Sequence, residues 1–342
     1  MILALVAFAA LQHQVSVPGA GAGPRCEGGG AFRTCYQLVD SIELTQPGSN
    51  IIAKFGGLAI TSKGNYVVAD FSDLNLKLYS PRGQWVSSAG RLGSGPGEFK
   101  SVARPVADQS GRVTVFDAKE ARISVFGETL SFLWSTTVEA GGYVTEVLPD
   151  RNGRFFVLGV LGDSSAAVFA DSIGRTVRRV LPVQRIRYRG EDPVSAWRAI
   201  TFASGALCGD TLVVVSSVTD SAFFVDRRTP GVRTERLPTL LVDGRRGPPL
   251  GKFSRSLISA WFESLTLPSA VFCLPDGIVV RSTLGPLGDG KPTPLAIRSV
   301  AGWRVFTDAP PIVAVRGPDL VALLGPALET VSVGVFRRRF ER

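Results

Sequence analysis

The sequence predicts an all-β fold made of repeated, four-stranded antiparallel units. Short runs rich in Val, Ile, Phe and Thr alternate with turns rich in Gly, Pro, Asp and Ser, and long helical patterns are nearly absent. Similar hairpins recur along the 342 residues at intervals of roughly 40 to 60 positions. Hydrophobic residues make up 45% of the chain, so a large core is possible. A chain of 342 residues can form a single closed all-β domain.

The recurring hairpin is the clearest feature of the chain. Its two best copies are KGNYVVAD (63–70) and SGRVTVFD (110–117), in which Gly64 matches Gly111 and Asp70 matches Asp117. Four further copies are NGRFFVLG (152–159), DTLVVVSS (210–217), DGIVVRST (276–283) and PDLVALLG (318–325). Six copies at this spacing indicate an array or a propeller.

Each unit predicts four strands in the same order. An apolar inner strand ends in a glycine turn, and a second strand of β-branched and aromatic residues follows. A short polar loop then leads to a third strand, such as LNLKLYS (74–80), and to a fourth, such as QWVSSAG (84–90). Four antiparallel strands form a propeller blade. Blades packed around an axis bury both faces and leave few exposed edges.

The two ends of the chain are expected to complete one blade together. The last unit, 312–336, supplies about three strands. The segment YQLVDSIEL (36–44) alternates apolar and polar residues and belongs to no other unit. We expect it to form the outer strand of the last blade, a closure that leaves no free sheet edge. The predicted fold is therefore a six-bladed β-propeller over 36–342.

The stretch from Gly90 to Phe126 resembles the NHL repeat. That repeat runs G-x-x-G-x-G-P-G-x-F, an apolar strand, D-x-x-G-x-[VI]-x-V-x-D, and a later R-[IV]-x-x-F. The matching residues are Gly90, Gly93, Gly95, Pro96, Gly97, Phe99, Asp108, Gly111, Val113, Val115, Asp117, Arg122, Ile123 and Phe126. The match extends over residues 57–138 and is weaker afterwards. The resemblance implies a six-bladed propeller similar to exported bacterial proteins grouped with TolB-like propellers.

The glycine-rich GSGPGEF (93–99) invites comparison with a phosphate-binding loop. No glycine precedes Lys100, so the order G-x-x-x-x-G-K-[ST] is absent. Glycine and proline at these spacings are typical of turns, because glycine adopts positive φ and proline restricts its own. We therefore interpret the segment as a turn between two blades.

The N-terminus predicts export. An apolar run from Ile2 to Leu11, too short to span a bilayer, is followed by small residues ending in Ala20-Gly21-Ala22. This pattern predicts a signal peptide over 1–22, although the basic segment that usually precedes the apolar run is missing, which leaves room for a start further upstream. No lipobox precedes Cys26, so we do not expect a lipoprotein. The mature chain would be periplasmic or extracellular, have no transmembrane segment, and begin with a linker over 23–35.

Export permits disulfides among the four cysteines. Cys26 and Cys35 bracket a glycine-rich loop, and we favour a bridge over two free thiols. Cys208 and Cys273 end similar segments of neighbouring blades. A bridge needs Cα atoms within about 7 Å, and adjacent inner strands at a channel tend to lie slightly further apart, which favours buried free thiols over a bridge. Neither pair has the spacing of a zinc site.

The candidate ligand-binding residues come from two long insertions, 183–199 and 240–264. Each connects the outer strand of one blade to the inner strand of the next, and long loops on one face often carry function. The candidates are Arg185, Arg187, Arg189, Trp197, Arg245, Arg246 and Trp261. Arginine and tryptophan are enriched at binding hot spots. The alternative is that the tryptophans cover the core and the arginines are merely solvated.

Composition excludes several chemistries. The single histidine is His13, inside the predicted signal, so the mature chain would lack histidine-dependent nucleophilic catalysis, acid–base chemistry and metal sites. The net charge of +9 comes mostly from scattered arginines and is interpreted as compositional background. We predict no catalytic residue, no metal ligand and no cofactor.

Three functions are compatible with this sequence. The favoured one is an exported, non-catalytic binding propeller for an unknown protein, small-molecule or glycan ligand. The second is a divalent-metal-dependent hydrolase or lactonase, which would need carboxylates at the channel mouth. The third is a polyanion- or nucleic-acid-binding NHL domain, which export argues against. Small and apolar side chains facing the channel would favour the first, carboxylates the second, and arginines with exposed aromatic residues the third.

Overall fold

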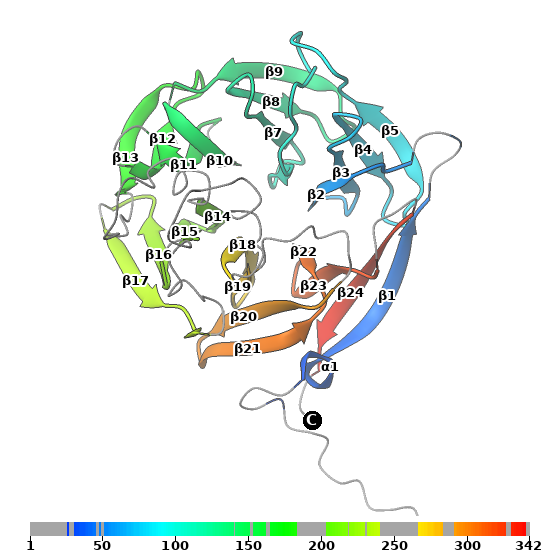
Figure 1. The fold of residues 1–342 in the computed structure, drawn as a ribbon, viewed down its shortest axis with the longest axis vertical. Coiled ribbons are helices and arrows are strands. Elements are labelled where there is room, and N and C mark those ends of the chain that lie inside the picture. The colour runs from blue at the N-terminus through cyan, green and yellow to red at the C-terminus, as the bar shows by residue number, and fades with distance from the viewer. Residues whose placement is uncertain are drawn as a thin grey trace, which may run out of the picture.

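The computed structural model describes residues 26, 31–45, 48, 51–139, 141–150, 153–161, 165–182, 203–217, 219–229, 231–239, 266–282, 291–325 and 330–339. These residues form six four-stranded antiparallel sheets, which are arranged in a ring around a central axis (Figure 1). The structure confirms the predicted six-bladed β-propeller. Among the described residues, no helix has the length and hydrophobicity that crossing a membrane requires.

The blades follow one another along the chain (Figure 1). The strands of each blade are named from the innermost to the outermost. Blade 1 has β2 (Phe55–Ile60), β3 (Tyr66–Asp70), β4 (Asn75–Tyr79) and β5 (Trp85–Ala89). Blade 2 has β6 (Val106–Ala107), β7 (Val113–Asp117), β8 (Arg122–Phe126) and β9 (Phe132–Thr137). Blade 3 has β10 (Gly142–Pro149), β11 (Phe155–Leu161), β12 (Ser165–Ala170) and β13 (Thr176–Pro182).

The second half of the ring has the same construction. Blade 4 has β14 (Ala203–Cys208), β15 (Thr211–Ser216), β16 (Ser221–Asp226) and β17 (Val232–Arg236). Blade 5 has β18 (Pro268–Leu274), β19 (Gly277–Ser282), β20 (Thr293–Ser299) and β21 (Gly302–Ala309). Blade 6 has β22 (Ile312–Arg316), β23 (Asp319–Leu323), β24 (Val331–Arg338) and β1 (Tyr36–Leu44).

The N-terminal strand closes the ring as predicted. β1 pairs antiparallel with β24, from Tyr36 opposite Arg338 to Leu44 opposite Val331, and Figure 1 shows the two ends of the chain side by side in blade 6. Ile42 and Leu44 of β1 are buried in a cluster that also contains residues of blade 1. The closure thus joins the first and last blades through both backbone pairing and hydrophobic packing.

The repeated hairpin turns share one geometry. The amide of Gly64 donates to Thr61, that of Gly111 to Asp108 and that of Gly153 to Asp150. The three glycines have φ of +82°, +81° and +70°, a conformation in which a Cβ is unfavourable. This backbone requirement explains why glycine recurs at these positions of the repeat.

In blades 1 and 2, the aspartate at the end of the second strand accepts hydrogen bonds from the segment that leads into the blade. The fully buried Asp117 accepts hydrogen bonds from the amides of Lys100 at 2.6 Å and Ser101 at 3.1 Å, in the connection from blade 1. Asp70 does the same for the amides of Ala53 and Lys54. These buried carboxylates therefore fix the backbone of the connection that precedes each blade through its amide groups.

The GSGPGEF segment is an inter-blade turn, as predicted. It lies between β5 and β6, and Phe99 at its end is fully buried. The amide of Gly95 donates to the Glu98 carboxylate at 2.8 Å. The Glu98 carboxylate thus occupies a backbone amide that a phosphate-binding loop would direct at its ligand.

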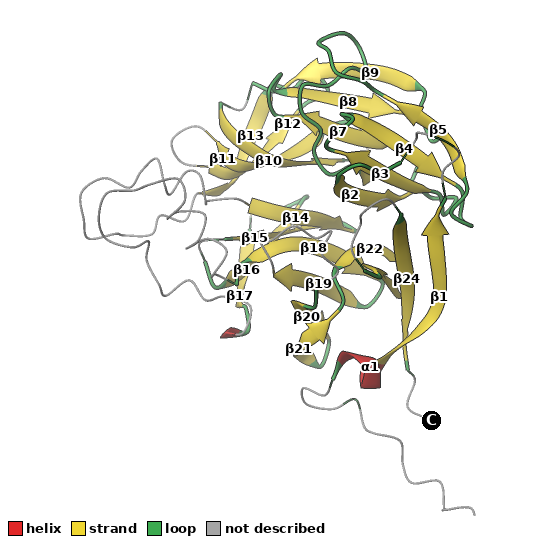
Figure 2. Cartoon of the chain, turned by 45° about the vertical axis from the view of Figure 1, so that its right-hand side comes forward, coloured by secondary structure: helices red, strands yellow, loops and turns green. Residues whose placement is uncertain are grey.

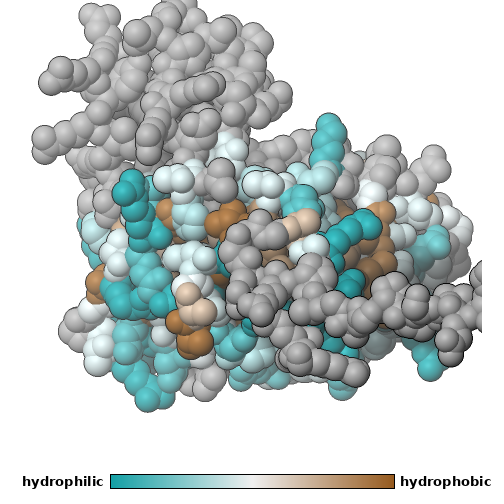
Figure 3. All heavy atoms as spheres, turned by 90° about the horizontal axis from the view of Figure 1, so that it is seen from below, coloured by the Kyte–Doolittle hydropathy of each residue, from teal (hydrophilic) through white to brown (hydrophobic). Residues whose placement is uncertain are grey.

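The hydrophobic core is divided into clusters between neighbouring blades. One cluster joins β3, β4 and β7 through residues such as Val67, Leu76 and Val113, and another joins blades 5 and 6 through Phe272, Val279 and Leu320. On the side drawn in Figure 3, hydrophobic residues reach the surface only as small areas among hydrophilic ones. Packing between blades therefore buries most of the apolar side chains that the strands carry.

Residues just before β1 also pack against the propeller. The short helix α1 (Phe32–Cys35) lies beside the end of β1 (Figure 2), and the amide of Phe32 donates to both carboxylate oxygens of Asp308, at 2.9 and 3.1 Å. The predicted disulfide between Cys26 and Cys35 is confirmed, with Cα atoms 5.1 Å apart. Residues 31–35 of the expected linker are thus attached to the outer side of blades 5 and 6.

The expectation of free thiols at Cys208 and Cys273 was wrong. These residues form a disulfide with Cα atoms 5.4 Å apart, inside the range that a bridge requires. β14 and β18, the innermost strands of blades 4 and 5, come closer at their ends than the general spacing of strands around a channel suggested. The predicted signal peptide over 1–22 lies outside the described residues.

Candidate functional site

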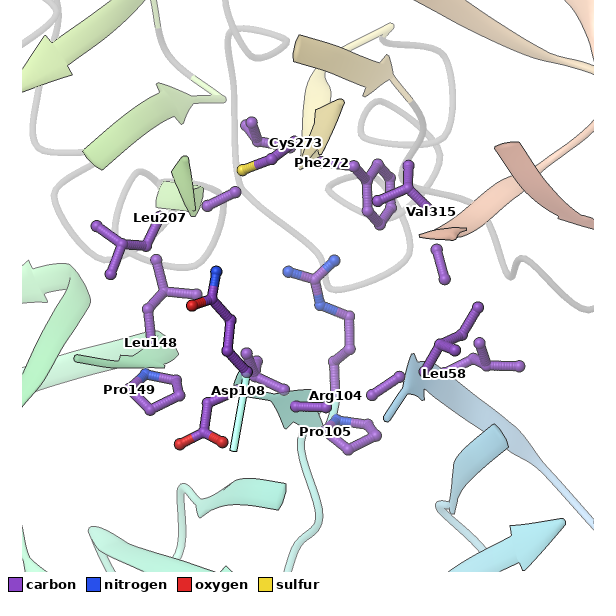
Figure 4. Close-up of a pocket in the computed structure, with 18 of the residues that line it drawn as sticks. Leu58, Arg104, Pro105, Asp108, Leu148, Pro149, Leu207, Phe272, Cys273 and Val315 are labelled. Carbon is purple, nitrogen blue, oxygen red and sulfur yellow. The ribbon is translucent and has the colours of Figure 1, made fainter. Parts of the chain in front are cut away.

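The centre of the ring contains a cavity of about 450 Å³. All six innermost strands, or residues next to them, contribute to its wall (Figure 4). This volume lies within the range of about 300 to 1,000 Å³ that is usual for small-molecule sites. The cavity is therefore the best-defined candidate site in the described part of the chain.

Most of the cavity wall is apolar. Figure 4 shows the side chains of Leu58, Leu148, Leu207, Phe272 and Val315 around the central space, each from a different blade. Small residues such as Ala59, Ala107, Ala206 and Ala314 complete the wall. According to the criterion set from the sequence, small and apolar side chains facing the channel favour a binding function.

Arg104 is the most prominent charged residue in the cavity. It precedes β6, and Figure 4 shows its side chain extending from the blade 2 side across the space toward Phe272. Its guanidinium carbon lies 5.5 Å from the centre of the Phe272 ring, and its Nη2 forms an ion pair with Glu146 of β10. About a quarter of the Arg104 side chain, 25%, is exposed, so the guanidinium is accessible from the cavity.

Glu146 is already occupied by protein donors. One carboxylate oxygen accepts from Arg104, and the other accepts from the Ser204 hydroxyl at 2.9 Å and the Gly205 amide at 2.8 Å. The residue is buried. A carboxylate with all of these partners positions Arg104 and has little capacity left for a metal ion.

Arg281 adds a second, more deeply buried guanidinium. It comes from β19, is 6% exposed, and donates from Nη1 to the carbonyl of Ile312 at 2.6 Å. Its guanidinium carbon lies 6.0 Å from the centre of the same Phe272 ring. Burial lowers the pKa of Arg281 to about 9, with a further lowering by the charge of Arg104 and an opposing effect of Glu146. The group remains charged at pH 7, but its charge is poorly compensated.

Two glycines make room for this charged cluster. A Cβ on Gly57 of β2 would lie 2.7 Å from Cγ of Arg104, and a Cβ on Gly205 would lie 2.6 Å from the carbonyl oxygen of Val213. Both distances are shorter than packed atoms tolerate. Gly57 therefore admits the stem of Arg104, and Gly205 lets β14 bring its amide to Glu146.

The cavity rim carries a second, self-contained charge pair. Arg112 donates from Nε to Asp108 at 2.8 Å, and the same carboxylate accepts from the Ser110 hydroxyl at 2.7 Å. Asp108, Ser110 and Arg112 all line the cavity. They belong to the turn between the first and second strands of blade 2.

The ring has two faces. We call the side that carries the turns between first and second strands the turn face. The opposite side, which carries the loops after Asp70 and Asp117, is the loop face.

The structure does not test the site residues predicted from the sequence. Arg185, Arg187, Arg189, Trp197, Arg245, Arg246 and Trp261 all lie outside the described residues. The sequence predicts that their insertions share a face with the loops between the second and third strands, which is the loop face. The cavity instead reaches the turn face. The wall includes Cys273, so the disulfide to Cys208 belongs to the site that the structure does describe.

Sequence reasoning missed Arg104, Glu146, Arg281 and Phe272. A signal was present, because Glu146 and Arg281 are charged residues inside otherwise apolar strand segments, YVTEVLP (143–149) and GIVVRS (277–282). A charge at such a position is rarely buried without a partner. What the sequence could not supply was the partner, since the three charged residues come from three different blades.

Metal coordination receives no support from the described residues, in which no group of three or more His, Cys, Asp or Glu side chains is placed to hold a metal ion. The carboxylates closest to the cavity, Glu146 and Asp108, already accept from arginines and from hydroxyl or amide groups. The donor set described at the cavity thus does not match that of a divalent-metal hydrolase.

The chain is similar to several solved propellers at the level of the fold. A Bacteroides fragilis protein whose name marks it as expected to be exported has a TM-score of 0.64 and 11% identity, covering 91% of this chain and 97% of its own. A DUF4221-family member from Bacteroides vulgatus has a TM-score of 0.58 and 9% identity, covering 89% and 99%. A streptogramin B lyase has a TM-score of 0.50 and 9% identity, covering 89% and 98%.

These likenesses concern the fold alone, because every identity is low. No protein-family model and no curated protein sequence matches the chain. The proteins with this fold include one whose name indicates export and one that is a lyase. The fold by itself therefore does not indicate a particular activity.

Proposed function

We propose that this protein is an exported, non-catalytic binding propeller whose central cavity holds a small, mostly apolar ligand. The observation that carries the proposal is the cavity of about 450 Å³, with apolar side chains from all six blades around a positioned guanidinium. Concave, mostly apolar sites with a few convergent polar groups are typical of small-molecule recognition.

The chemistry of the cavity supports binding over hydrolysis. Glu146 and Asp108 are held by protein donors on both sides, so neither is free to act as a general base or as a metal ligand. The mature chain would also lack histidine. The lyase among the similar structures does not alter this argument, because its likeness extends to the fold only.

Export is the second part of the proposal. Two disulfides link Cys26 to Cys35 and Cys208 to Cys273, and such bonds persist mainly in oxidising compartments. The apolar run and the A-x-A-like site near Ala22 support cleavage of a signal peptide. Mass spectrometry of the native protein should find no peptide from Ile2 to Ala20, and retention of these residues in the cytoplasm would contradict export.

We also infer an evolutionary relation to NHL-repeat, TolB-like propellers. The hydrogen bonds of Asp70 and Asp117 to the preceding inter-blade connections and the buried Phe99 give structural reasons for the residues that match the repeat. The insertions 183–199 and 240–264 would then serve as a separate contact surface for a larger partner on the loop face.

The cavity can be tested with a ligand screen by thermal shift on the mature domain, with and without Ca²⁺. A ligand at 100 times its Kd stabilises the folded state by about 2.7 kcal/mol and should raise the Tm measurably. The variant Leu207→Trp places a larger side chain in the wall shown in Figure 4. Apolar hits should lose their effect on it.

Val300→Trp is the matched control, because Val300 is 99% exposed in the turn between β20 and β21. It adds the same side chain far from the cavity and should respond to ligands as the wild type does. Circular dichroism checks that both variants are folded. Hits that stabilise all three proteins equally would place binding elsewhere, and stabilisation by Ca²⁺ alone would favour the metal-dependent alternative.

A further inference from the structure

The cavity carries more positive than negative charge. Arg104 and Arg281 both approach the Phe272 ring, whereas Glu146 is the carboxylate that interacts electrostatically with this pair. The rim residues Asp108 and Arg112 neutralise each other. Among the described residues, two guanidiniums against one carboxylate leave an excess of one positive charge beside the cavity.

Part of the donor capacity of these arginines is unused. Arg104 uses Nη2 for Glu146, and within the described residues no acceptor is recorded for its Nε or Nη1. Arg281 uses Nη1 for the Ile312 carbonyl, and its buried Nε has no hydrogen-bond partner. Arg104 lines the cavity, so an anion bound there would accept from the donors that Arg104 leaves unused.

We propose that the ligand of this cavity is a monocarboxylate with an apolar body. Its carboxylate would accept from the guanidinium hydrogens of Arg104 that Glu146 leaves free, because a planar guanidinium matches the two oxygens of a carboxylate. Arg281, which approaches the same Phe272 ring, would strengthen the attraction through its charge. The apolar body would contact Leu58, Leu148, Leu207 and Val315 in the wall (Figure 4).

The charge balance also selects the kind of anion. The excess of one positive charge is matched by a single negative charge, and a dianionic phosphate would bring a second one without a counter-charge. Glu146 stays with Arg104, because its other oxygen is held by Ser204 and Gly205. Glu146 would therefore fix the direction of the guanidinium and would disfavour ligands that enter with a charge of −2.

This inference rests on the proposed cavity function and deepens it, so its test must separate the two. The probes are indole-3-acetate, indole-3-acetamide and tryptamine, and the matching naphthalene acid, amide and amine, titrated calorimetrically into the full chain. The aromatic body is the same within each series, and the head group changes from an anion to a neutral amide to a cation. We expect each acid to bind about 10- to 100-fold more tightly than its amide, and each amine to bind most weakly.

Variants assign the preference to Arg104. Arg104→Met should reduce the ratio of acid to amide affinity to about one while the amide still binds. Because this change leaves Glu146 buried without its ion pair, Arg104→Met combined with Glu146→Gln is the second variant. Arg104→Lys should keep part of the preference, since it keeps the charge and loses the planar fork. Arg236→Met, at an exposed position of the outermost strand of blade 4, is the matched control and should keep all of it.

The outcomes are distinct. Equal affinities of acid and amide for the wild type would overturn the carboxylate inference and leave the cavity function standing. Retention of the preference in Arg104→Met, or its loss in Arg236→Met, would overturn the assignment to Arg104. Failure of all six probes to bind would count against the cavity function as well.

Discussion

Cys208 and Cys273 are bonded to each other and join β14 of blade 4 to β18 of blade 5, with their Cα atoms 5.4 Å apart. Cys273 also lines the central cavity. The bond therefore ties two neighbouring blades at the wall of the candidate site, where no backbone pairing connects the two sheets.

Replacing this pair should destabilise the protein strongly. The bridge closes a loop between positions 65 residues apart, for which the chain-entropy relation gives about 4 kcal/mol of stabilisation. We expect Cys208→Ala with Cys273→Ala to lower the free energy of urea unfolding by roughly that amount. The pair Cys26→Ala with Cys35→Ala spans 9 residues and should cost less, about 2.5 kcal/mol. A larger loss for the second pair would contradict the ranking.

Asp117→Ala should be among the more damaging single substitutions. The side chain is fully buried and accepts from the Ser101 hydroxyl and from several backbone amides, including those of Lys100 and Lys119. Removing this buried acceptor breaks all of these hydrogen bonds at once, at a cost of about 3 kcal/mol. Asp220→Ala is the control, because Asp220 is 50% exposed and its ion pair should contribute less than about 1 kcal/mol. Equal melting temperatures would refute the role assigned to Asp117.

Stability should fall on the acid side. Burial alone raises the pKa of the Asp117 carboxyl, but hydrogen bonds from Ser101, Lys100 and Lys119 lower it more, and its pKa lies below the ordinary value. The pKa values of Asp70 and Asp108 are lowered in the same way. Such groups contribute their full stability above the unfolded pKa of about 3.9 and lose it as pH falls through the folded pKa.

The free energy of unfolding should therefore change little on account of these groups between about pH 5 and 7, and decline below about pH 4. Denaturant titrations over this range measure the decline. Asp117→Asn removes one of the titrating groups and should make it shallower. A decline of the same slope in the wild type and the variant would exclude Asp117 as a contributor.

Deleting the N-terminal strand should open the ring. A chain that begins at Thr45 lacks β1, so the edge of β24 loses its pairing and Ile42 and Leu44 are missing from the core. We expect aggregation or a sharp loss of thermal stability. A chain that begins at Arg25 keeps β1 and both disulfides and is the control. An unchanged Tm after deletion of β1, with a monomeric elution in gel filtration, would contradict closure by this strand.

The role of the arginines in the two insertions in binding a partner remains a prediction. Replacing Arg187, Arg189, Arg245 and Arg246 with Ala should change stability by no more than about 0.5 kcal/mol per site if they are on the surface. The same change should weaken capture of any protein partner in a pull-down, because arginine is enriched at binding hot spots. Arg228→Ala with Arg236→Ala, at exposed positions of blade 4, is the control. Full retention of binding by the folded quadruple variant would remove these arginines from the contact surface.

The architecture of this protein could be predicted from local sequence patterns. Alternating apolar residues, glycine turns and the aspartates at 70 and 117 are local requirements of a hairpin, so six copies of the pattern could be recognised without coordinates. Ring closure by 36–44 followed from the same logic, because a last blade of three strands leaves an edge that only an unassigned strand can cover. Each of these inferences depends on neighbours in the chain or on backbone pairing.

The arrangement of side chains at the centre of the ring depends on contacts between blades. The contact of Arg104 with Glu146, the approach of Arg281 to Phe272 and the bond between Cys208 and Cys273 all join different blades, at sequence separations that no local pattern encodes. Their geometry depends on how closely the blades converge on the axis, which is set by packing between sheets. For that reason the charge of the cavity, and with it the class of ligand, could not be derived until the blades were assembled.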